Sequence, residues 1–226
     1  MNRLLSSAMV ALTGAAMVLG AAPQWAGQAA AQAPSAPATL PVDPQAAGLT
    51  CFYSAVVTSG GHTEAVAEAT WFLFDTARRV TSTAPESFIA KVEELASLPP
   101  PNLESLATDA PQLLPLCASR YPLISSKRTI TLPADSLARD MQCFALTSYM
   151  AGVAESELED SGESPFGKRV AALADKLSAT LTEDRLKAAG VTDQAAMQAL
   201  FARSLRDVSP LGNPMKVLEA CEAVAD

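Results

Sequence analysis

The only histidine of this 226-residue sequence, His62, stands in a turn-like stretch over 59–64 that reads Ser-Gly-Gly-His-Thr-Glu. A serine, a histidine and a carboxylate are the groups of a hydrolytic triad, in which the imidazole takes a proton from the nucleophilic hydroxyl. Neighbours in sequence rarely form a triad by themselves, and a Gly-Gly pair is typical of a junction between two helices. The helix junction is the preferred interpretation. A hydrolase that uses Ser59, His62 and Glu64 is the alternative. The sequence contains no serine-elbow, dinucleotide or phosphate-loop motif, which favours a non-enzymatic protein.

Four cysteines form an even set: Cys51, Cys117, Cys143 and Cys221. In an oxidising compartment an even set favours two disulfides over free thiols. Zinc is the competing interpretation, but structural zinc sites use closely spaced ligands, and here no two cysteines are close in sequence. We therefore predict no metal site and no cofactor.

The N-terminus has the pattern of a secretory signal. One positive charge, Arg3, precedes an uncharged apolar stretch over 4–22, and three alanines ending at Ala31 offer a cleavage site before Gln32. The sequence therefore predicts a signal peptide over 1–31 and a periplasmic or secreted protein. The alternative is an uncleaved N-terminal anchor, because the apolar stretch is almost long enough to span a bilayer.

The chain is acidic, with 16 Lys and Arg against 24 Asp and Glu and a net charge of −8. Such a charge repels phosphate backbones, so nucleic acid is excluded as a partner. Five of the acidic residues are clustered in one run: Glu155, Glu157, Glu159, Asp160 and Glu163. We expect this run to fray into a solvated loop, because carboxylates at a helix C-terminus oppose the helix dipole. The alternative is a docking site for a basic partner.

The rest of the chain divides into a tether and two similar halves. Residues 32–47 are rich in Pro and Ala and predict a disordered tether. The segments 48–122 and 135–226, joined by a linker over 123–134, each open with a Cys-Phe pair and close on a late cysteine. We therefore predict an all-α fold of two tandem, disulfide-closed helical subdomains that arose by internal duplication.

Apolar periodicity and Pro or Gly breaks give the expected helices. They cover 49–59, 63–82, 85–98, 110–120, 135–158, 165–181, 183–189, 193–207 and 211–224. The alternating stretch 127–132 is read as an extended linker. If four helices in each half run alternately up and down, the first begins where the last ends. The pairs Cys51–Cys117 and Cys143–Cys221 are therefore preferred among the three possible connectivities.

Trp71-Phe72-Leu73-Phe74 places four large apolar side chains in succession. Consecutive positions point all round a helix, so one face cannot bury them all. The preferred interpretation is a central helix packed on every side. The alternative is that Trp71, Phe72 and Phe74 form an exposed interaction patch.

These features favour an exported, non-enzymatic helical module that binds a protein partner or supports the cell envelope. One alternative is a holdase-like stress chaperone that uses the Trp71–Phe74 cluster after acid loosens the halves. The other is the hydrolase that uses Ser59, His62 and Glu64.

Overall fold

The computed structural model describes residues 38–100 and 103–225. The predicted signal peptide and the tether before residue 38 lie outside the described residues. Within them the chain forms helices and no strand, which confirms the all-α fold class. None of the helices within these ranges is long and apolar enough to cross a membrane.

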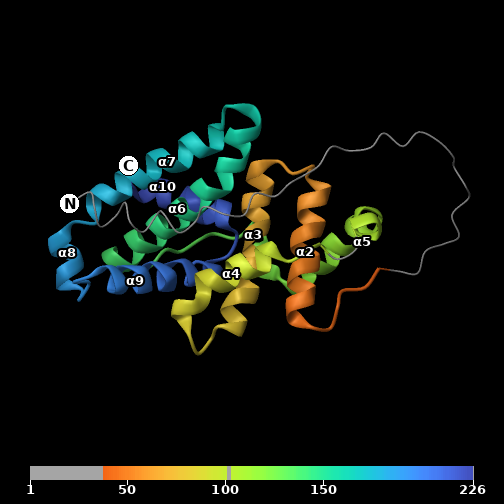
Figure 1. The fold of residues 1–226 in the computed structure, drawn as a ribbon, viewed down its shortest axis with the longest axis horizontal. Helices are drawn as coiled ribbons and strands as arrows, with labels where there is room; N and C mark the ends of the chain where they lie inside the picture. Colours follow the sequence, from red (N-terminus) through yellow and green to blue (C-terminus); the bar gives the residue numbers. More distant parts are fainter. Residues whose placement is uncertain (1–37, 101–102, 226) are drawn as a thin grey trace, which may run out of the picture.

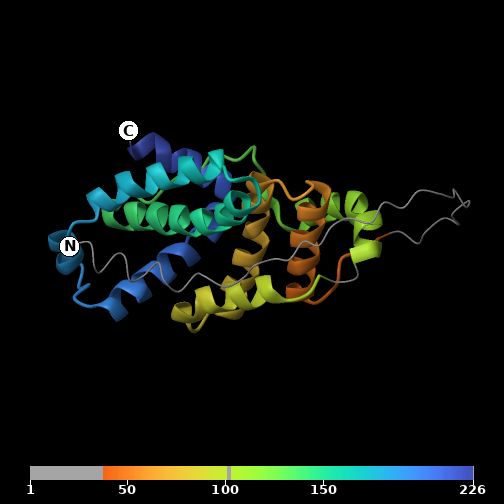
Figure 2. The same ribbon diagram turned by 45° about the horizontal axis from the view of Figure 1, so that its top comes forward.

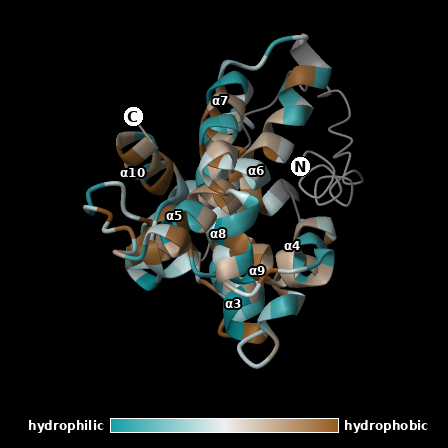
Figure 3. Ribbon diagram, turned by 90° about the vertical axis from the view of Figure 1, so that its left-hand side faces the viewer, coloured by the Kyte–Doolittle hydropathy of each residue, from teal (hydrophilic) through white to brown (hydrophobic). Residues whose placement is uncertain are grey.

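In chain order the helical elements are α2 (Pro44–Thr58), α3 (Thr63–Val80), the 3-10 turn η2 (Pro85–Ser87), α4 (Phe88–Ser97), α5 (Leu103–Arg120), η3 (Pro122–Ile124), α6 (Ser136–Ser161), α7 (Pro165–Thr180), α8 (Glu183–Ala188), α9 (Gln194–Arg206), η4 (Ser209–Leu211) and α10 (Pro214–Ala225). The expected helices are all present. The expected extended linker over 127–132 is wrong at its start, because Lys127 lies in a turn and Arg128 in a bend, and residues 129–132 connect to α6 without regular structure. In Figure 3 most of these helices carry both hydrophilic and hydrophobic residues, as expected of helices that bury one side.

Helix α2 begins inside the predicted tether. Asp43 caps it, because its carboxylate accepts a hydrogen bond from the backbone N–H of Ala46 at 2.7 Å, and Pro44 suits the first turn. Arg120, at the end of α5, donates hydrogen bonds to the carbonyls of Pro41 and Val42 at 2.6 and 3.2 Å. The prediction that residues 44–47 are disordered is therefore wrong.

Two other helices are longer than expected. Helix α5 begins at Leu103 and contains Pro111 and Pro115, whose side chains are exposed on the side away from the core. Helix α6 continues through four of the five residues of the acidic run to Ser161, and Glu163 follows the C-cap Gly162, which takes the left-handed conformation (φ +74°). The expected fraying of the acidic run into a loop is therefore wrong.

In the first half, α2 lies between α3 and α5 (Figure 1). The close approach of α2 to α3 depends on Gly48, where a β-carbon would lie 2.0 Å from Oγ1 of Thr76. The Cys51–Cys117 disulfide joins α2 to α5, and both cysteines are buried. Helix α5 makes its main packing contacts with α2 alone, so it forms the outer edge of this half.

In the second half, α6 is the central helix and packs on α7, α9 and α10, as Figure 2 shows from a second direction. The Cys143–Cys221 disulfide joins α6 to α10. Arg169 of α7 adds a two-pronged ion pair with Glu222 of α10, with N···O distances of 2.6 and 2.8 Å. Both disulfides thus have the predicted pairing.

Helix α3 connects the halves, because it also packs on α6, α10 and η4. Trp71 and Phe74 are 1% and 0% exposed, and Phe72 is 4% exposed. The Trp71 indole N–H donates to the carbonyl of Ser209 at 2.9 Å, and the Phe74 ring lies 4.9 Å from that of Tyr149. These residues therefore form a central helix packed on every side, and the alternative of an exposed patch is wrong.

The two halves share one continuous cluster of buried apolar side chains. Their helices do not pack alike, because α5 packs mainly on α2 whereas α10 contacts α6, α7 and α3. The internal duplication and the division into 48–122 and 135–226 therefore stay predictions from the cysteine pattern.

Candidate binding groove

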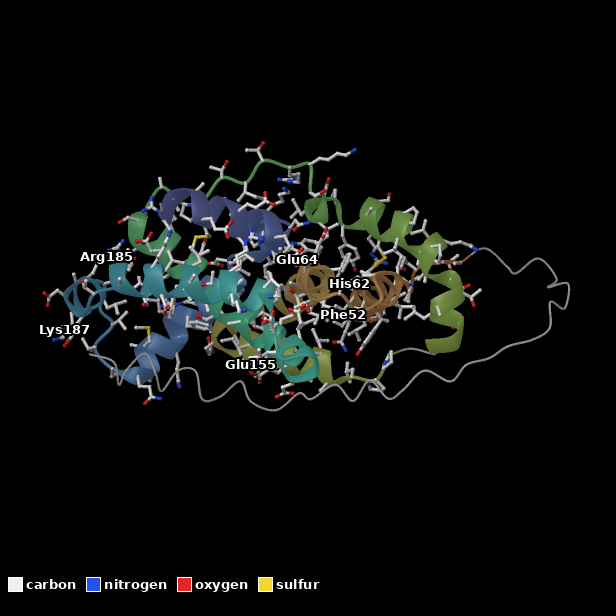
Figure 4. The ribbon with its side chains drawn as sticks, turned by 90° about the horizontal axis from the view of Figure 1, so that it is seen from above. Phe52, His62, Glu64, Glu155, Arg185 and Lys187 are labelled. Atoms are coloured by element: carbon white, nitrogen blue, oxygen red, sulfur yellow. A yellow bond between two sulfur atoms is a disulfide. The ribbon has the colours of Figure 1, made fainter. Side chains whose placement is uncertain are left out.

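The predicted hydrolytic turn is a helix junction in the structure. Gly60 and Gly61 take positive φ values of +66° and +77°, and His62 is the residue before the first turn of α3. The Ser59 hydroxyl donates to the backbone carbonyl of Val56 at 2.8 Å. Among the hydrogen bonds of the described residues, none joins Ser59 to His62. Figure 4 shows His62 and Glu64 at this exposed end of α3, far from Arg185 and Lys187 on α8.

An open groove of about 780 Å³ lies beside this junction. Its walls come from the C-terminal end of α2, the N-terminal half of α3, the C-terminal half of α5 and residues 122–128. The volume falls in the range of small-molecule sites, which is about 300–1,000 Å³. The lining residues are Ala55, Thr58, Ser59, Ala65, Glu68, Ala69, Phe72, Leu114, Cys117, Ala118, Pro122, Ile124, Ser125, Ser126, Lys127 and Arg128.

The floor of the groove is apolar. Small alanine side chains from α2, α3 and α5 leave the space open, and larger apolar side chains such as Phe72, Leu114 and Ile124 line it. The Phe72 ring packs edge-to-face on the Tyr121 ring, with the ring centroids 5.5 Å apart. Burial raises the pKa of Tyr121 above its usual 10.0, so this phenol stays neutral. The phenol beneath Phe72 therefore adds no charge to the groove, and the one carboxylate among the described lining residues is that of Glu68.

One edge of the groove is basic. Lys127 and Arg128 are exposed on a tight turn, in which the Ser125 hydroxyl accepts a hydrogen bond from the N–H of Lys127 at 3.4 Å. Among the side chains that the structure describes, no carboxylate lies within ion-pairing distance of either cation. Arg128 also lines a smaller neighbouring depression with Lys216, which is paired with Glu219 at 2.6 Å. Two unpaired cations in an acidic protein make this edge attractive to an anion.

The basic turn is held in place from the second half of the chain. The Asn213 side chain, 1% exposed, donates to the carbonyl of Ile124 at 2.9 Å and to Oε1 of Glu68 at 2.7 Å. Its oxygen accepts from the N–H of Met215 at 2.9 Å and so caps α10. Asn213 therefore connects α10, α3 and the segment that carries Lys127.

Gly212, just before α10, allows the chain to approach the segment around Leu123 closely. A β-carbon at Gly212 would lie 2.7 Å from the carbonyl oxygen of Leu123, and its φ of +124° strongly favours glycine. The second half thus sets the position of one wall of a groove whose other walls belong to the first half.

The acidic run of α6 has a partly structural role. The Ser164 hydroxyl donates to Glu157, and it also accepts a hydrogen bond from the N–H of Gly167 at 2.8 Å as the N-cap of α7. Glu155, Glu159 and Glu163 are exposed. This run lies outside the groove lining.

The sequence did not predict the groove, although two of its lining residues, Ser59 and Phe72, were candidates for other roles. Lys127 and Arg128 were read only as part of an extended linker. A signal for Asn213 was present, because Asn followed by Pro214 is a typical helix start, yet the expected helix began at residue 211. The part of the chain that the structure describes contains no group of three or more His, Cys, Asp or Glu side chains that could hold a metal.

Comparison with known proteins places this chain in no group. No family model matches the sequence, and the searches of curated proteins and of solved structures give no match.

Proposed function

We propose that this protein is an exported, non-enzymatic helical module that binds a partner in the groove, either a segment of another protein or a component of the cell envelope. The observation that carries the proposal is the unpaired Lys127 and Arg128 at the edge of an apolar floor. Export is supported by the signal pattern over 1–31 and by two disulfides, which persist in oxidising compartments.

Binding is favoured over catalysis by the chemistry of the lining residues. A nucleophile needs an adjacent base, and the Ser59 hydroxyl is directed instead to the Val56 carbonyl. The chaperone alternative depended on the aromatic cluster of α3. That cluster is buried, so a holdase function would first require the halves to separate.

The test is site-specific photo-crosslinking in the cells that produce the protein. A benzophenone amino acid is placed at Ser126, an exposed position in the groove lining, or at Ala179 on α7, which contributes nothing to the groove. We expect a discrete adduct from position 126 that is missing from position 179. No adduct at 126, or the same adducts at both positions, would contradict the proposal. N-terminal sequencing of the recovered protein should begin at Gln32.

A further inference from the structure

We infer that the groove binds a single-chain anionic amphiphile, with its alkyl chain on the apolar floor and its acidic head group at Lys127 and Arg128. This inference rests on the proposed function, because it names the partner of the same groove. A fatty carboxylate is the simplest ligand of this class.

The size of the groove favours such a ligand over a folded protein. A stable protein interface usually involves about 20–30 residues on each side. The groove is lined by 16 residues and has a volume of about 780 Å³, which suits a small molecule.

The floor suits an alkyl chain. Its small side chains come from three helices, among them Ala55, Ala69 and Ala118, so the floor is shaped mainly by helix backbones and offers few hydrogen-bonding groups. A flexible chain of methylene groups needs no such groups and gains from leaving water. Each methylene that becomes fully buried should strengthen binding by about fourfold, and less where the groove stays open to solvent.

The edge suits an acidic head group. Arg128 presents a planar guanidinium that can hold a carboxylate with two hydrogen bonds, and Lys127 adds a second positive charge. The hydroxyls of Ser125 and Ser126 line the same edge and can donate to the remaining oxygen lone pairs. This edge is positively charged although the protein as a whole carries a net charge of −8.

Glu68 is the only carboxylate among the described residues that line the groove, and it opposes an anion. Its Oε1 accepts the Asn213 amide at 2.7 Å. A Glu68→Gln variant keeps an acceptor for Asn213 and removes the charge. This variant should therefore bind an anionic ligand more tightly than the wild type.

The inference is tested by calorimetric titration of the disulfide-intact exported chain with dodecanoate below its micellar concentration. Dodecan-1-ol and dodecyltrimethylammonium are the neutral and cationic controls. We expect dodecanoate to bind more tightly than either control and decanoate to bind more weakly than dodecanoate. The double variant Lys127→Gln/Arg128→Gln should weaken dodecanoate at least tenfold and leave dodecan-1-ol unchanged.

Two matched controls separate the groove from general effects. Lys168→Gln/Arg203→Gln removes the same two kinds of charge at exposed positions outside the lining and should leave dodecanoate binding unchanged. Ala118→Phe places a ring in the groove and should weaken every alkyl ligand, whereas Ser119→Phe, the next exposed residue of α5, should not.

Failure of this inference differs from failure of the proposed function. If dodecanoate does not bind, or binds no better than dodecyltrimethylammonium, the inference is overturned. A protein adduct from the benzophenone at position 126 would likewise overturn it, while it supports the proposed function. The absence of any adduct at 126 would overturn the proposed function itself.

Discussion

The Asn213 amide donates to the Glu68 carboxylate at 2.7 Å across 145 positions of sequence. The same amide group donates to the carbonyl of Ile124, and the amide oxygen caps α10. One buried side chain thus fixes α10, α3 and the segment that carries the basic edge of the groove.

Asn213→Ala should lower the free energy of unfolding by about 2–4 kcal/mol. The substitution leaves the Ile124 carbonyl and the Glu68 carboxylate without their donor and removes the cap of α10. Urea unfolding monitored by circular dichroism measures the loss. Asn213→Asp is the informative control, because it keeps the cap acceptor but faces Glu68 with a second negative charge. An Asp variant as stable as the wild type would show that only the cap matters.

Removal of the two disulfides should affect different parts of the fold. Each closes a long loop, of 66 and 78 residues, and the chain-entropy model gives a stabilisation of about 4 kcal/mol for either. Helix α5 has α2 as its main packing partner, whereas α10 is also held by α3, α6 and α7. We therefore expect Cys51→Ala/Cys117→Ala to free α5 locally, while Cys143→Ala/Cys221→Ala lowers stability as a whole.

Amide hydrogen exchange distinguishes these outcomes. In the Cys51→Ala/Cys117→Ala variant, residues 105–120 should exchange much faster while α6 keeps its protection. In the other variant, α10 should lose protection together with α6. Equal and uniform loss of protection in both variants would refute the idea that α5 is held mainly by its disulfide.

Much of the fold could be predicted because its determinants are local. The Gly60-Gly61 pair ends α2, Pro165 begins α7 and Gly190 follows α8, each through its own backbone preference. The disulfide pairing was predicted from an expected up-and-down order of the helices, and the structure confirms the pairing. The burial of the aromatic cluster in α3 was predicted because four consecutive apolar side chains point all round a helix and need packing partners on every side.

The groove could not be predicted, because it depends on contacts between distant residues. Nothing near Lys127 in the sequence indicates that Asn213 holds its segment against α3, or that Gly212 allows the Leu123 carbonyl to approach. The early start of α2 was missed for a different reason. Its proline-rich composition resembles that of a tether, but the Asp43 cap stabilises the first turn of the helix, and Arg120 holds residues 41 and 42 just before it.

Gly48→Ala should destabilise the protein although alanine favours helices. In a free helix interior the change gains up to about 1 kcal/mol, but here the new β-carbon would lie 2.0 Å from Oγ1 of Thr76. We expect a net loss of about 1–3 kcal/mol from overpacking. Combining it with Thr76→Ala should recover part of the loss, so that the two changes are not additive in a double-mutant cycle.

Gly152→Ala is the matched control for this packing effect. Gly152 lies in α6, and a β-carbon there would meet no atom within 4 Å. This variant should gain about 0.5–1 kcal/mol in chemical unfolding. If both glycine variants changed stability in the same direction, close packing of α2 on α3 would not be the cause.

The protein should lose stability in alkali through Tyr149. Burial raises the pKa of this phenol above its usual 10.0, and Glu93 raises it further. The folded state therefore holds the proton more tightly than the unfolded chain, so this contribution is fully present below pH 10.0 and is lost as the pH rises beyond it. Tyr149→Phe keeps the ring against Phe74 and removes the titrating hydroxyl.

Urea unfolding midpoints measured at about pH 8 and about pH 11 test this prediction. Between these two pH values the midpoint should fall less in the variant than in the wild type. Some decline should persist, because burial also raises the pKa of Tyr53 and Tyr121. An identical fall in both proteins would mean that ionisation of Tyr149 does not limit stability in alkali.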